Sequence, residues 1–262
     1  MHLAVYIKKQ ALREDPRVLA LRKRLEEACC HVYDIYDRED ILPQTGMVLS
    51  LGGDGTFLCA ARLVGDLGIP IIGVNFGRLG FLSENTPDEV VNAIKNRSYK
   101  IEDRCLLDVN GEYAFNEVSI HRQGGAMMGV TVKIDGRALP VYWADGLLVA
   151  TSSGSTAYSL SVGGPICTPD ARVLIIAPIA PHNLNVRPLI VPDTARIEIS
   201  VSSRDGKAVL SLDNHSEEVD TSVVLNVSVA QFSLKRVRLE GNDFVKALTS
   251  KLFWGEDVRN SY

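Results

Sequence analysis

Residues 47–56 read MVLSLGGDGT, and this stretch decides the fold. Its first five residues form an apolar run typical of a buried strand, and a helical pattern follows over residues 56–64. The glycines between them let the backbone turn tightly and approach a ligand closely. The first turn of a helix offers unpaired N–H groups and the positive end of the helix dipole, which together favour a phosphate. Gly52, Gly53 and Thr56 are therefore a candidate phosphate-binding loop.

Asp54 is the unexpected residue in this loop, because its charge would repel a phosphate. A carboxylate at that position makes sense if it accepts a proton from a hydroxyl group or helps to hold a metal ion. A plain tight turn with Asp54 as the N-cap of the helix explains the same letters, since short glycine motifs are weak evidence alone. Both interpretations of Asp54 stay open at this point.

Strand and helix patterns alternate on both sides of this loop, through residues 1–105. Apolar runs predict further buried strands over residues 3–7 and 69–74. Residues 15–16 read DP, which predicts an N-cap followed by a proline at the first helical position. Residues 86–89 read TPDE, a capping box that opens another helix. Such alternation predicts an α/β domain with a Rossmann-like parallel sheet and crossover helices.

The apolar pattern changes after residue 105 to an alternation with a period of two. Residues 135–136 read DG and supply a hairpin turn behind one alternating run. The alternation slips by one residue at 235–236, which indicates either a bulge or a break between two strands. Alternation with turn residues predicts an antiparallel, sandwich-like all-β domain over residues 106–242. A helical pattern returns over residues 243–254, in a segment that is a candidate to pack back on the first domain.

Composition and charge exclude several classes of protein. The chain has 262 residues and a net charge of -4, whereas a nucleic-acid-binding domain normally carries a basic excess. No apolar run approaches the roughly 20 residues that a membrane-spanning helix needs. The N-terminus shows no secretory signal. We therefore expect a protein that partners with neither nucleic acid nor membrane.

The five cysteines indicate reduced thiols. Their number is odd and no C-x-x-C pair occurs, so they predict neither a disulfide framework nor a zinc site. The neighbours Cys29, Cys30 and His31 are poorly placed to chelate one metal together. We expect no metal site built from protein side chains, and a cytoplasmic location.

Two polar motifs lie in the second half of the chain. Asn116-Glu117 places an amide beside a carboxylate, which suits hydrogen bonding to a nucleotide's base edge and ribose hydroxyls. A solvated strand end explains this pair at least as well. Residues 145–161 read DGLLVATSSGSTAYSLS and run from a strand into hydroxyls and glycines, where Tyr158 is able to stack on a base or ribose. A flexible serine-rich loop is the alternative, although the apolar run before it and the GGP at 163–165 argue against disorder.

Taken together, these residues resemble the NAD kinase family. The order and spacing agree from about residue 47 to the C-terminus, whereas the first 46 residues agree only in general pattern. GGDG is shared with lipid kinases and phosphofructokinases, but GSTAYSLS together with the Asn-Glu pair makes the resemblance specific. It is carried by GGDGT at 52–56, GVNFGRLGFL at 73–82, Asn116-Glu117, the segment from residue 145, APIAPH at 177–182 and RPL at 187–189.

The resemblance implies an enzyme that moves a phosphoryl group from ATP, or a similar donor, onto the 2′-hydroxyl of the adenosine ribose of NAD to make NADP. It implies an α/β domain followed by an all-β domain, a divalent metal such as Mg²⁺ that arrives with ATP, and a homodimer or homotetramer. It makes Asp54 the expected catalytic base. The NAD-binding residues that it implies are Asp54, Gly55, Asn116, Glu117, Asp145, Thr156, Ala157, Tyr158, Ser159, Leu160, Ser161 and Ala180.

Three places in the sequence depart from the usual family pattern. Residues 151–154 read Thr-Ser-Ser-Gly where many members have Thr-Pro-Thr-Gly. Trp143 stands where a basic residue is common. Residues 213–215 read Asp-Asn-His where an Asp-Gly-Gln-like segment often occurs. We assign no role to the last two from the sequence.

Three other classes of protein compete with this interpretation. A lipid kinase of the diacylglycerol type shares GGDGT, but it needs an apolar acceptor site and a route to a membrane, and no basic amphipathic helix is apparent. A non-catalytic NADP-sensing module would keep the glycines and hydroxyls without needing Asp54. A dehydrogenase is disfavoured because no G-x-G-x-x-G follows the first strand. Formation of NADP from NAD and ATP separates these classes.

Overall fold

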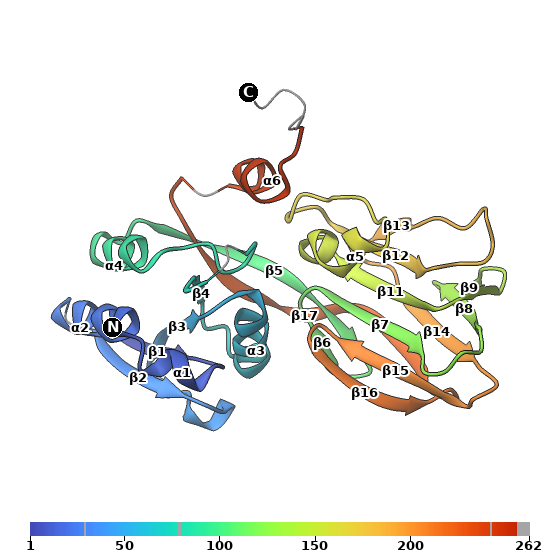
Figure 1. The fold of residues 1–262 in the computed structure, drawn as a ribbon, viewed down its shortest axis with the longest axis horizontal. Helices are drawn as coiled ribbons and strands as arrows, with labels where there is room; N and C mark the ends of the chain where they lie inside the picture. Colours follow the sequence, from blue (N-terminus) through green and yellow to red (C-terminus); the bar gives the residue numbers. More distant parts are fainter. Residues whose placement is uncertain (29, 78–79, 242, 256–262) are drawn as a thin grey trace. The chain divides into compact units, whose positions relative to one another are not determined.

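The computed structural model describes residues 1–28, 30–77, 80–241 and 243–255. The chain divides into two compact units, which Figure 1 shows in the colours of the sequence. The first unit comprises Met1–Asp103 with Leu234–Tyr262, and the second comprises Arg104–Ser233. Two long strands, β5 and β17, run through the boundaries between them.

The first unit is built on a parallel sheet with helices on both faces. Its strand order is β2-β1-β3-β4, and each neighbouring pair of these strands is parallel. Helices α2 and α4 cover one face, where Leu21, Leu49 and Val90 share one apolar core, and α3 lies on the other face (Figure 1). This is the predicted Rossmann-like α/β architecture. The elements are β1 (His2–Tyr6), α1 (Gln10–Arg13), α2 (Pro16–Glu27), β2 (His31–Ile35), η1 (Arg38–Asp40), β3 (Thr45–Leu51), α3 (Asp54–Val64), η2 (Gly65–Leu67), β4 (Ile71–Val74), α4 (Pro87–Asn96) and α6 (Phe244–Leu252).

Helix starts in this unit follow the sequence signals. Asp15 caps α2 by accepting the Arg17 N–H at 2.8 Å, and Pro16 is the first helical residue. Thr86 and Glu89 form the capping box of α4, in which the Glu89 carboxylate accepts the Thr86 N–H at 2.7 Å. Strand β2 was not predicted, because it lies at the edge of the sheet, is mostly half-buried and lacks a continuous apolar run.

The second unit is an antiparallel sandwich of two sheets. One sheet has the strand order β13-β12-β11-β7-β15-β16, and the other contains β10-β8-β14-β17 together with β9. Val149, Val132 and Val227 come from the two sheets and share one apolar core, as the alternating pattern predicted. Residues 135–136 form the β8–β9 turn with φ of 49° and 78°, which confirms the DG signal. The elements are β5 (Tyr99–Val109), β6 (Glu112–Ala114), β7 (Glu117–Arg122), β8 (Met128–Ile134), β9 (Arg137–Ala138), β10 (Tyr142–Ala144), β11 (Gly146–Thr151), η3 (Ser153–Thr156), α5 (Tyr158–Ser161), β12 (Val173–Ile179), β13 (Leu189–Pro192), β14 (Ile197–Ser202), β15 (Lys207–Leu212), β16 (His215–Asp220) and β17 (Val224–Leu239).

The slip in the alternation of β17 has a physical cause. The strand is continuous through residues 235–236, so the alternative of a break between two strands is wrong. Arg236 takes a buried position, 9% exposed, next to buried Val237. Its guanidinium donates to the Glu84 carboxylate at 2.7 Å and to the Phe81 carbonyl at 2.9 Å. An ion pair thus stabilises a charged residue at a position where the pattern alone expected none.

Candidate functional site

The glycine-rich loop lies at the carboxyl end of β3 and opens α3. Gly52 has a φ of 150°, and a Cβ there would collide with the hydroxyl of Thr56. Gly53 is the N-cap of α3, and nothing lies within 4 Å of the Cβ that it lacks. Gly53 and Gly55 are both exposed. The loop therefore combines an accessible helix start with open space, which the phosphate-loop prediction requires.

Asp54 is the first residue of α3, but its side chain does not cap the helix. Its carboxylate instead accepts three consecutive backbone N–H groups. Oδ2 accepts from Phe81 at 2.8 Å, and Oδ1 accepts from Leu82 at 3.0 Å and from Ser83 at 2.9 Å. The alternative of a plain turn with Asp54 as N-cap is therefore wrong. A carboxylate has about four acceptor positions, so Oδ2 keeps one for a further partner.

The loop that holds Asp54 approaches its neighbours very closely. A Cβ at Gly80 would collide with the Asp54 carboxylate, and a Cβ at Gly73 would collide with the backbone of the same loop. Both glycines belong to the motif at 73–82, of which residues 78–79 lie outside the described residues. The motif is glycine-rich because side chains at these two positions would displace the carboxylate or the loop.

Asn116 and Glu117 stand at the start of β7 in the second unit, and both are buried. Asp213, in the turn between β15 and β16, holds this strand start through three backbone N–H groups. Its Oδ2 accepts from Phe115 at 2.7 Å, and its Oδ1 accepts from Asn116 at 2.7 Å and from Glu117 at 3.2 Å. The interpretation of the Asn-Glu pair as a solvated strand end is therefore wrong.

The Glu117 side chain is a buried acid with an open hydrogen-bonding position. Burial raises the pKa of Glu117 to about 8, with a further upward contribution from the Asp213 carboxylate and a downward one from the Tyr158 backbone N–H. Its Oε2 atom is buried and has no hydrogen-bond partner among the described residues. A buried, unpartnered oxygen that changes protonation near neutral pH marks a candidate ligand-binding position.

The hydroxyl-rich segment packs on the backbone of Asn116. The Thr151 N–H donates to the Asn116 carbonyl at 2.8 Å, and a Cβ at Gly154 would collide with that same carbonyl. The 3₁₀ turn η3 and the short helix α5 follow at once. The alternative of a flexible serine-rich loop is therefore wrong, because the segment is folded and closely packed.

The predicted residues of this segment differ in exposure. Ser159 is fully buried, and its hydroxyl has no partner among the described residues. Ser161 is exposed. The half-buried members are Thr156, Ala157, Tyr158 and Leu160. The buried and unpartnered hydroxyl of Ser159 is a second polar atom, besides the Glu117 oxygen, that is available to a ligand.

Tyr158 stacks on His121, with ring centroids 5.7 Å apart and an angle of 23° between the planes. It also packs against a small apolar cluster that includes Leu148 and Ile175. The glycine- and serine-rich sequence around Tyr158 predicts few core neighbours for this ring, and that prediction is wrong, because β11 and β12 supply them. Burial lowers the pKa of His121, while the Asp145 carboxylate opposes this shift.

Asp145 and Ala180 lie at neighbouring strand ends of the same sheet. The Asp145 N–H donates to the Ile179 carbonyl at 2.9 Å, and its carboxylate accepts Nε of Arg122 at 2.6 Å. Ala180 follows β12, is exposed and has a φ of 46°. This left-handed conformation costs a non-glycine residue on the order of 1 kcal/mol or more, and such strain is frequent at ligand-binding sites.

In the second unit, Asn116, Glu117 and the segment 151–161 pack at the start of β7, whereas Asp145 and Ala180 lie beside its other end. Residues 52–56 belong to the first unit. Three supporting residues were not predicted from the sequence, namely His121 under Tyr158, Arg122 beside Asp145, and Asp213. Each is a single residue without motif spacing. Asp213 carried a partial signal, because Asp-Asn indicates a turn, but a turn signal does not show which N–H groups the carboxylate will accept.

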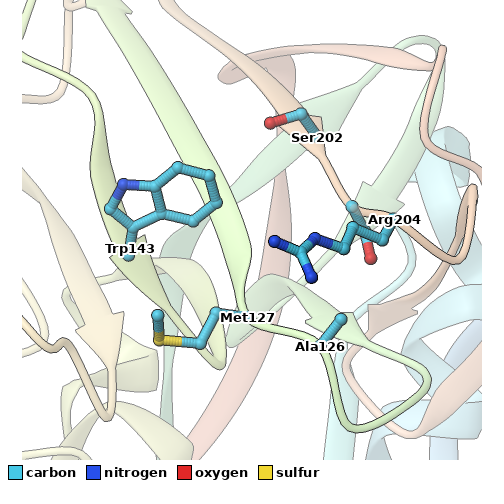
Figure 2. A pocket seen from close by; sticks show the side chains of 6 residues that line it. Ala126, Met127, Trp143, Ser202 and Arg204 are labelled. Carbon is cyan, nitrogen blue, oxygen red and sulfur yellow. The ribbon is translucent and has the colours of Figure 1, made fainter.

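The second unit also has a cavity of about 550 Å³ (Figure 2). Trp143 and Met127 line it with exposed side chains, and Arg204 points across it toward Trp143 (Figure 2). Large exposed apolar side chains around a concave surface are typical of a contact site. The full lining consists of Ala126, Met127, Trp143, Ser202, Ser203 and Arg204.

The described ranges contain no group of three or more His, Cys, Asp or Glu side chains arranged to hold a metal ion. Cys30, Cys59, Cys105 and Cys167 form no disulfide bond, and Cys29 lies outside the described part of the chain. No helix within the described ranges is long and apolar enough to span a membrane.

A parallel α/β unit with a GGDGT turn, followed by an antiparallel sandwich with a buried Asn-Glu pair, defines a two-domain nucleotide-binding phosphotransferase. Family profiles match both units. The profile described as ATP-NAD kinase N-terminal domain matches residues 17–100, and the ATP-NAD kinase C-terminal domain matches residues 115–239. The chain belongs to the ATP-NAD kinase family.

Individual relatives agree with this assignment. The chain is 41% identical to the NAD kinase of Bacteroides fragilis over 238 residues, which cover 86% of this chain and 81% of the relative. It is 43% identical to the NAD kinase of Porphyromonas gingivalis over 233 residues, which cover 84% and 80%. The resemblance to the NAD kinase family is confirmed, and the chain is an enzyme, a kinase of NAD. The lipid-kinase, sensing-module and dehydrogenase alternatives are therefore wrong.

Solved structures share the two-domain fold. An NAD kinase from Archaeoglobus fulgidus in complex with ATP is 26% identical and superposes with a TM-score of 0.79, covering 92% of this chain and 94% of that one. A yeast NADH kinase complexed with NADH superposes with a TM-score of 0.85 over 100% of this chain and 90% of that one. At 23% identity, the second likeness shows the fold alone.

Proposed function

We propose that the chain transfers the γ-phosphoryl group of ATP to the 2′-hydroxyl of the adenosine ribose of NAD, which yields NADP and ADP. The observation that carries this proposal is the Asp54 carboxylate, which three backbone N–H groups hold while Oδ2 keeps one acceptor position. A bond forms between the ribose O2′ and the γ-phosphorus, and the bond from that phosphorus to the β,γ-bridging oxygen breaks. The proton of the ribose hydroxyl passes to Asp54.

Asp54 suits the role of general base because it is held in place and lies in an open loop. Phosphoryl transfer asks the protein mainly to align the acceptor oxygen and to stabilise charge. A carboxylate within hydrogen-bond reach aims the hydroxyl and takes its proton, which is typically worth about 10²–10⁴ in rate. The exposed glycines at 53 and 55 leave space beside the carboxylate for ribose and phosphate. Gly52, Gly53 and Thr56 serve as the phosphate loop in this proposal.

Most residues of the NAD site that we propose lie in the second unit, on β7 and on the segments beside it. Two buried polar atoms without partners among the described residues, Oε2 of Glu117 and Oγ of Ser159, support this placement. A buried polar group normally has a partner, so a bound ligand would remove an energetic cost. The full proposed set, in addition to Asp54, is Gly55, Asn116, Glu117, Asp145, Thr156, Ala157, Tyr158, Ser159, Leu160, Ser161 and Ala180.

A divalent metal, which we propose to be Mg²⁺, arrives with ATP. Mg²⁺ is usually held by substrate phosphates, waters and one or two carboxylates, rather than by a cage of side chains. The glycine-rich loop fits such an ion, because the exposed Gly53 and Gly55 leave space beside the phosphates for the ion and its waters. When bound, the metal neutralises charge on the phosphates during transfer.

The direct test mixes the purified chain with ATP, Mg²⁺ and NAD and measures NADP by chromatography. We expect NADP to appear only when all three are present. Diacylglycerol vesicles replace NAD in a parallel reaction and should stay unphosphorylated. Phosphorylation of the lipid without phosphorylation of NAD would overturn the proposed acceptor.

We also propose a homodimer or homotetramer. Leu139, Val141 and Trp143, in and beside β9 and β10, have exposed apolar side chains. Trp143 lines the cavity of Figure 2 together with Met127. Self-association would remove this surface from water. Light scattering at micromolar concentration should give at least a dimer mass, and Trp143→Arg should lower it. A monomer mass for the unmodified chain would contradict the proposal.

A cytoplasmic location is the last part of the proposal. Cys30, Cys59, Cys105 and Cys167 form no disulfide bond, which suits a reducing compartment. Cell fractionation should place the kinase activity with the soluble cytoplasmic markers, and recovery from an oxidising compartment would contradict it.

A further inference from the structure

A buried ion network lies next to the loop that holds Asp54. The Glu84 carboxylate pairs with two cations, Arg236 at 2.7 Å and Lys251 at 3.1 Å. All three side chains are about nine-tenths buried, with exposures of 11%, 10% and 10%. They come from three parts of the first unit, namely the segment after β4, the end of β17 and helix α6. The network therefore joins the C-terminal helix to the loop after β4.

Both cations also contact Phe81. Nη2 of Arg236 donates to the Phe81 carbonyl at 2.9 Å, and Nζ of Lys251 lies 5.1 Å from the centre of the Phe81 ring. The N–H of the same residue donates to Oδ2 of Asp54 at 2.8 Å. Phe81 is thus held by two buried cations while its N–H holds the carboxylate.

The two oxygens of Asp54 depend on this residue unequally. Oδ1 accepts two N–H groups, from Leu82 and Ser83, whereas Oδ2 accepts one, from Phe81. Oδ2 is also the oxygen with the spare acceptor position. Displacement of Phe81 would therefore move the oxygen that has the spare acceptor position, while the other oxygen would keep both of its hydrogen bonds.

We propose that Arg236 and Lys251 are positioning residues for phosphoryl transfer, which fix Phe81 and through it Oδ2 of Asp54. This inference rests on the proposed role of Asp54 as the general base. Misplacement of a reacting group by about 1 Å lowers the reaction rate by as much as 10²-fold. A network that fixes Oδ2 of Asp54 therefore affects kcat. Stability alone is a poor reason for the network, because well-packed apolar side chains of similar volume are often as stabilising as a buried ion network.

The test compares Lys251→Gln with the matched control Lys246→Gln, which changes an exposed lysine of the same helix. We expect Lys251→Gln to lower kcat roughly tenfold and to change the KM for NAD less than twofold. Lys246→Gln should leave both unchanged, and the conservative Lys251→Arg should recover most of the loss. A rise in KM at constant kcat would overturn the proposal.

The decisive measurement repeats Lys251→Gln in an Asp54→Asn background. If Lys251 acts through Asp54, the additional loss of kcat there should be less than about twofold, because groups that act as a unit are not additive. An equal loss of kcat in the unmodified chain and in Asp54→Asn would overturn the proposal, since a merely structural effect of Lys251→Gln would be additive to that of Asp54→Asn. Should Lys251→Gln fail to fold, Phe81→Leu takes its place, because it removes the ring contact and keeps the ion pairs. We expect Phe81→Leu to lower kcat by less than Lys251→Gln would. This loss should also be smaller in the Asp54→Asn background than in the unmodified chain.

The two hypotheses fail in distinguishable ways. Near-normal turnover of Asp54→Asn alone would remove the general base and with it the reason for positioning. A large loss in Asp54→Asn together with normal kcat in Lys251→Gln would overturn only the positioning role.

Discussion

Asp54 in the first unit and Asp213 in the second are held by the same pattern of hydrogen bonds. Each carboxylate accepts three consecutive backbone N–H groups, two on Oδ1 and one on Oδ2. For Asp54 the donors are residues 81–83, and for Asp213 they are residues 115–117. In both cases a side chain distant in sequence fixes a short stretch of backbone, so the hydrogen-bond pattern alone does not show which carboxylate takes part in chemistry.

The surroundings of the two carboxylates differ. Asp54 is flanked by exposed glycines, and a Cβ at Gly80 would already displace it. Asp213 lies in a hairpin turn with a φ of 52°, and its own N–H donates to the Glu117 carbonyl at 2.9 Å. We therefore assign Asp54 a reactive role, and we infer that Asp213 supports the strand start that carries Asn116 and Glu117. Open space next to a fixed carboxylate, rather than the fixation itself, distinguishes the two.

Replacement of Asp54 by Asn should produce the largest effect. Asn keeps the shape, but its amide cannot accept the ribose proton, so we expect kcat to fall at least about a hundredfold while NAD still binds. If Oδ1 keeps its two partners, the amide nitrogen faces the Phe81 N–H, and this mismatch should cost roughly 1–3 kcal/mol of stability. Turnover, calorimetry with NAD and urea unfolding give the three quantities. Near-normal turnover would leave Asp54 as a loop-former, and loss of NAD binding would make it a recognition residue.

The matched change Asp213→Asn creates the same mismatch in the second unit, against the Phe115 N–H. The stability cost should therefore be similar, roughly 1–3 kcal/mol. Because the displaced strand start carries Asn116 and Glu117, we expect the KM for NAD to rise roughly tenfold and kcat to change less than about threefold. A loss of kcat as large as that of Asp54→Asn would break the distinction between the two carboxylates.

Sequence patterns predicted the elements that have strong local signals. The caps at Asp15 and Thr86, the buried strand before GGDGT and the DG turn follow from side-chain chemistry within a few residues. The edge strand β2 was missed because burial on one side does not require a continuous apolar run. The buried Arg236 disturbed the pattern because its partner, Glu84, is 152 residues away in sequence.

The candidate site was predictable as motifs but not as contacts. Asp54 was recognisable from GGDGT, yet its three donors lie 27 to 29 residues away. Asp213 is about a hundred residues from the N–H groups that it accepts, and no local pattern encodes such a pairing. Tyr158 was expected to have few core neighbours because its sequence neighbours are small, but its stacking partner His121 comes from another strand.

The pH dependence of stability sharpens the role assigned to Asp213. The pKa of Glu117 is about 8 in the folded chain, whereas its ordinary value is 4.5. Between pH 4.5 and pH 8 the folded chain therefore keeps a proton on Glu117 that the unfolded chain has released. The stabilising contribution of Glu117 to the free energy of unfolding is therefore fully present below about pH 4.5, and it falls as the pH rises toward 8. Relative to Glu117→Gln, the unmodified chain should lose at most about 1.4 kcal/mol per pH unit in this window.

Urea unfolding of both proteins from pH 5 to pH 8 measures this difference, and Glu217→Gln on exposed β16 is the matched control. The free energy of unfolding of Glu217→Gln should change with pH in the same way as that of the unmodified chain. In Asp213→Asn the free energy of unfolding should depend less steeply on pH, because this change removes a negative charge that raises the pKa of Glu117. A constant difference between the unmodified chain and Glu117→Gln at every pH would show that Glu117 does not titrate in this window.

Replacement of Tyr158 by Ala should give the smallest effect and tests whether this ring faces NAD or only its own core. The ring is half-buried on His121, so its loss must cost some folding stability. A stacked aromatic contact is worth about 0.5–1.5 kcal/mol beyond buried area, so we expect NAD affinity to fall roughly fivefold. Tyr158→Phe keeps the ring and should bind NAD normally. The outcome against this role is an unchanged affinity for NAD in Tyr158→Ala by calorimetry, together with a clear loss of stability. The ring would then serve only to pack on His121. The proposed NAD site would in that case centre on Asn116, Glu117 and Ser159.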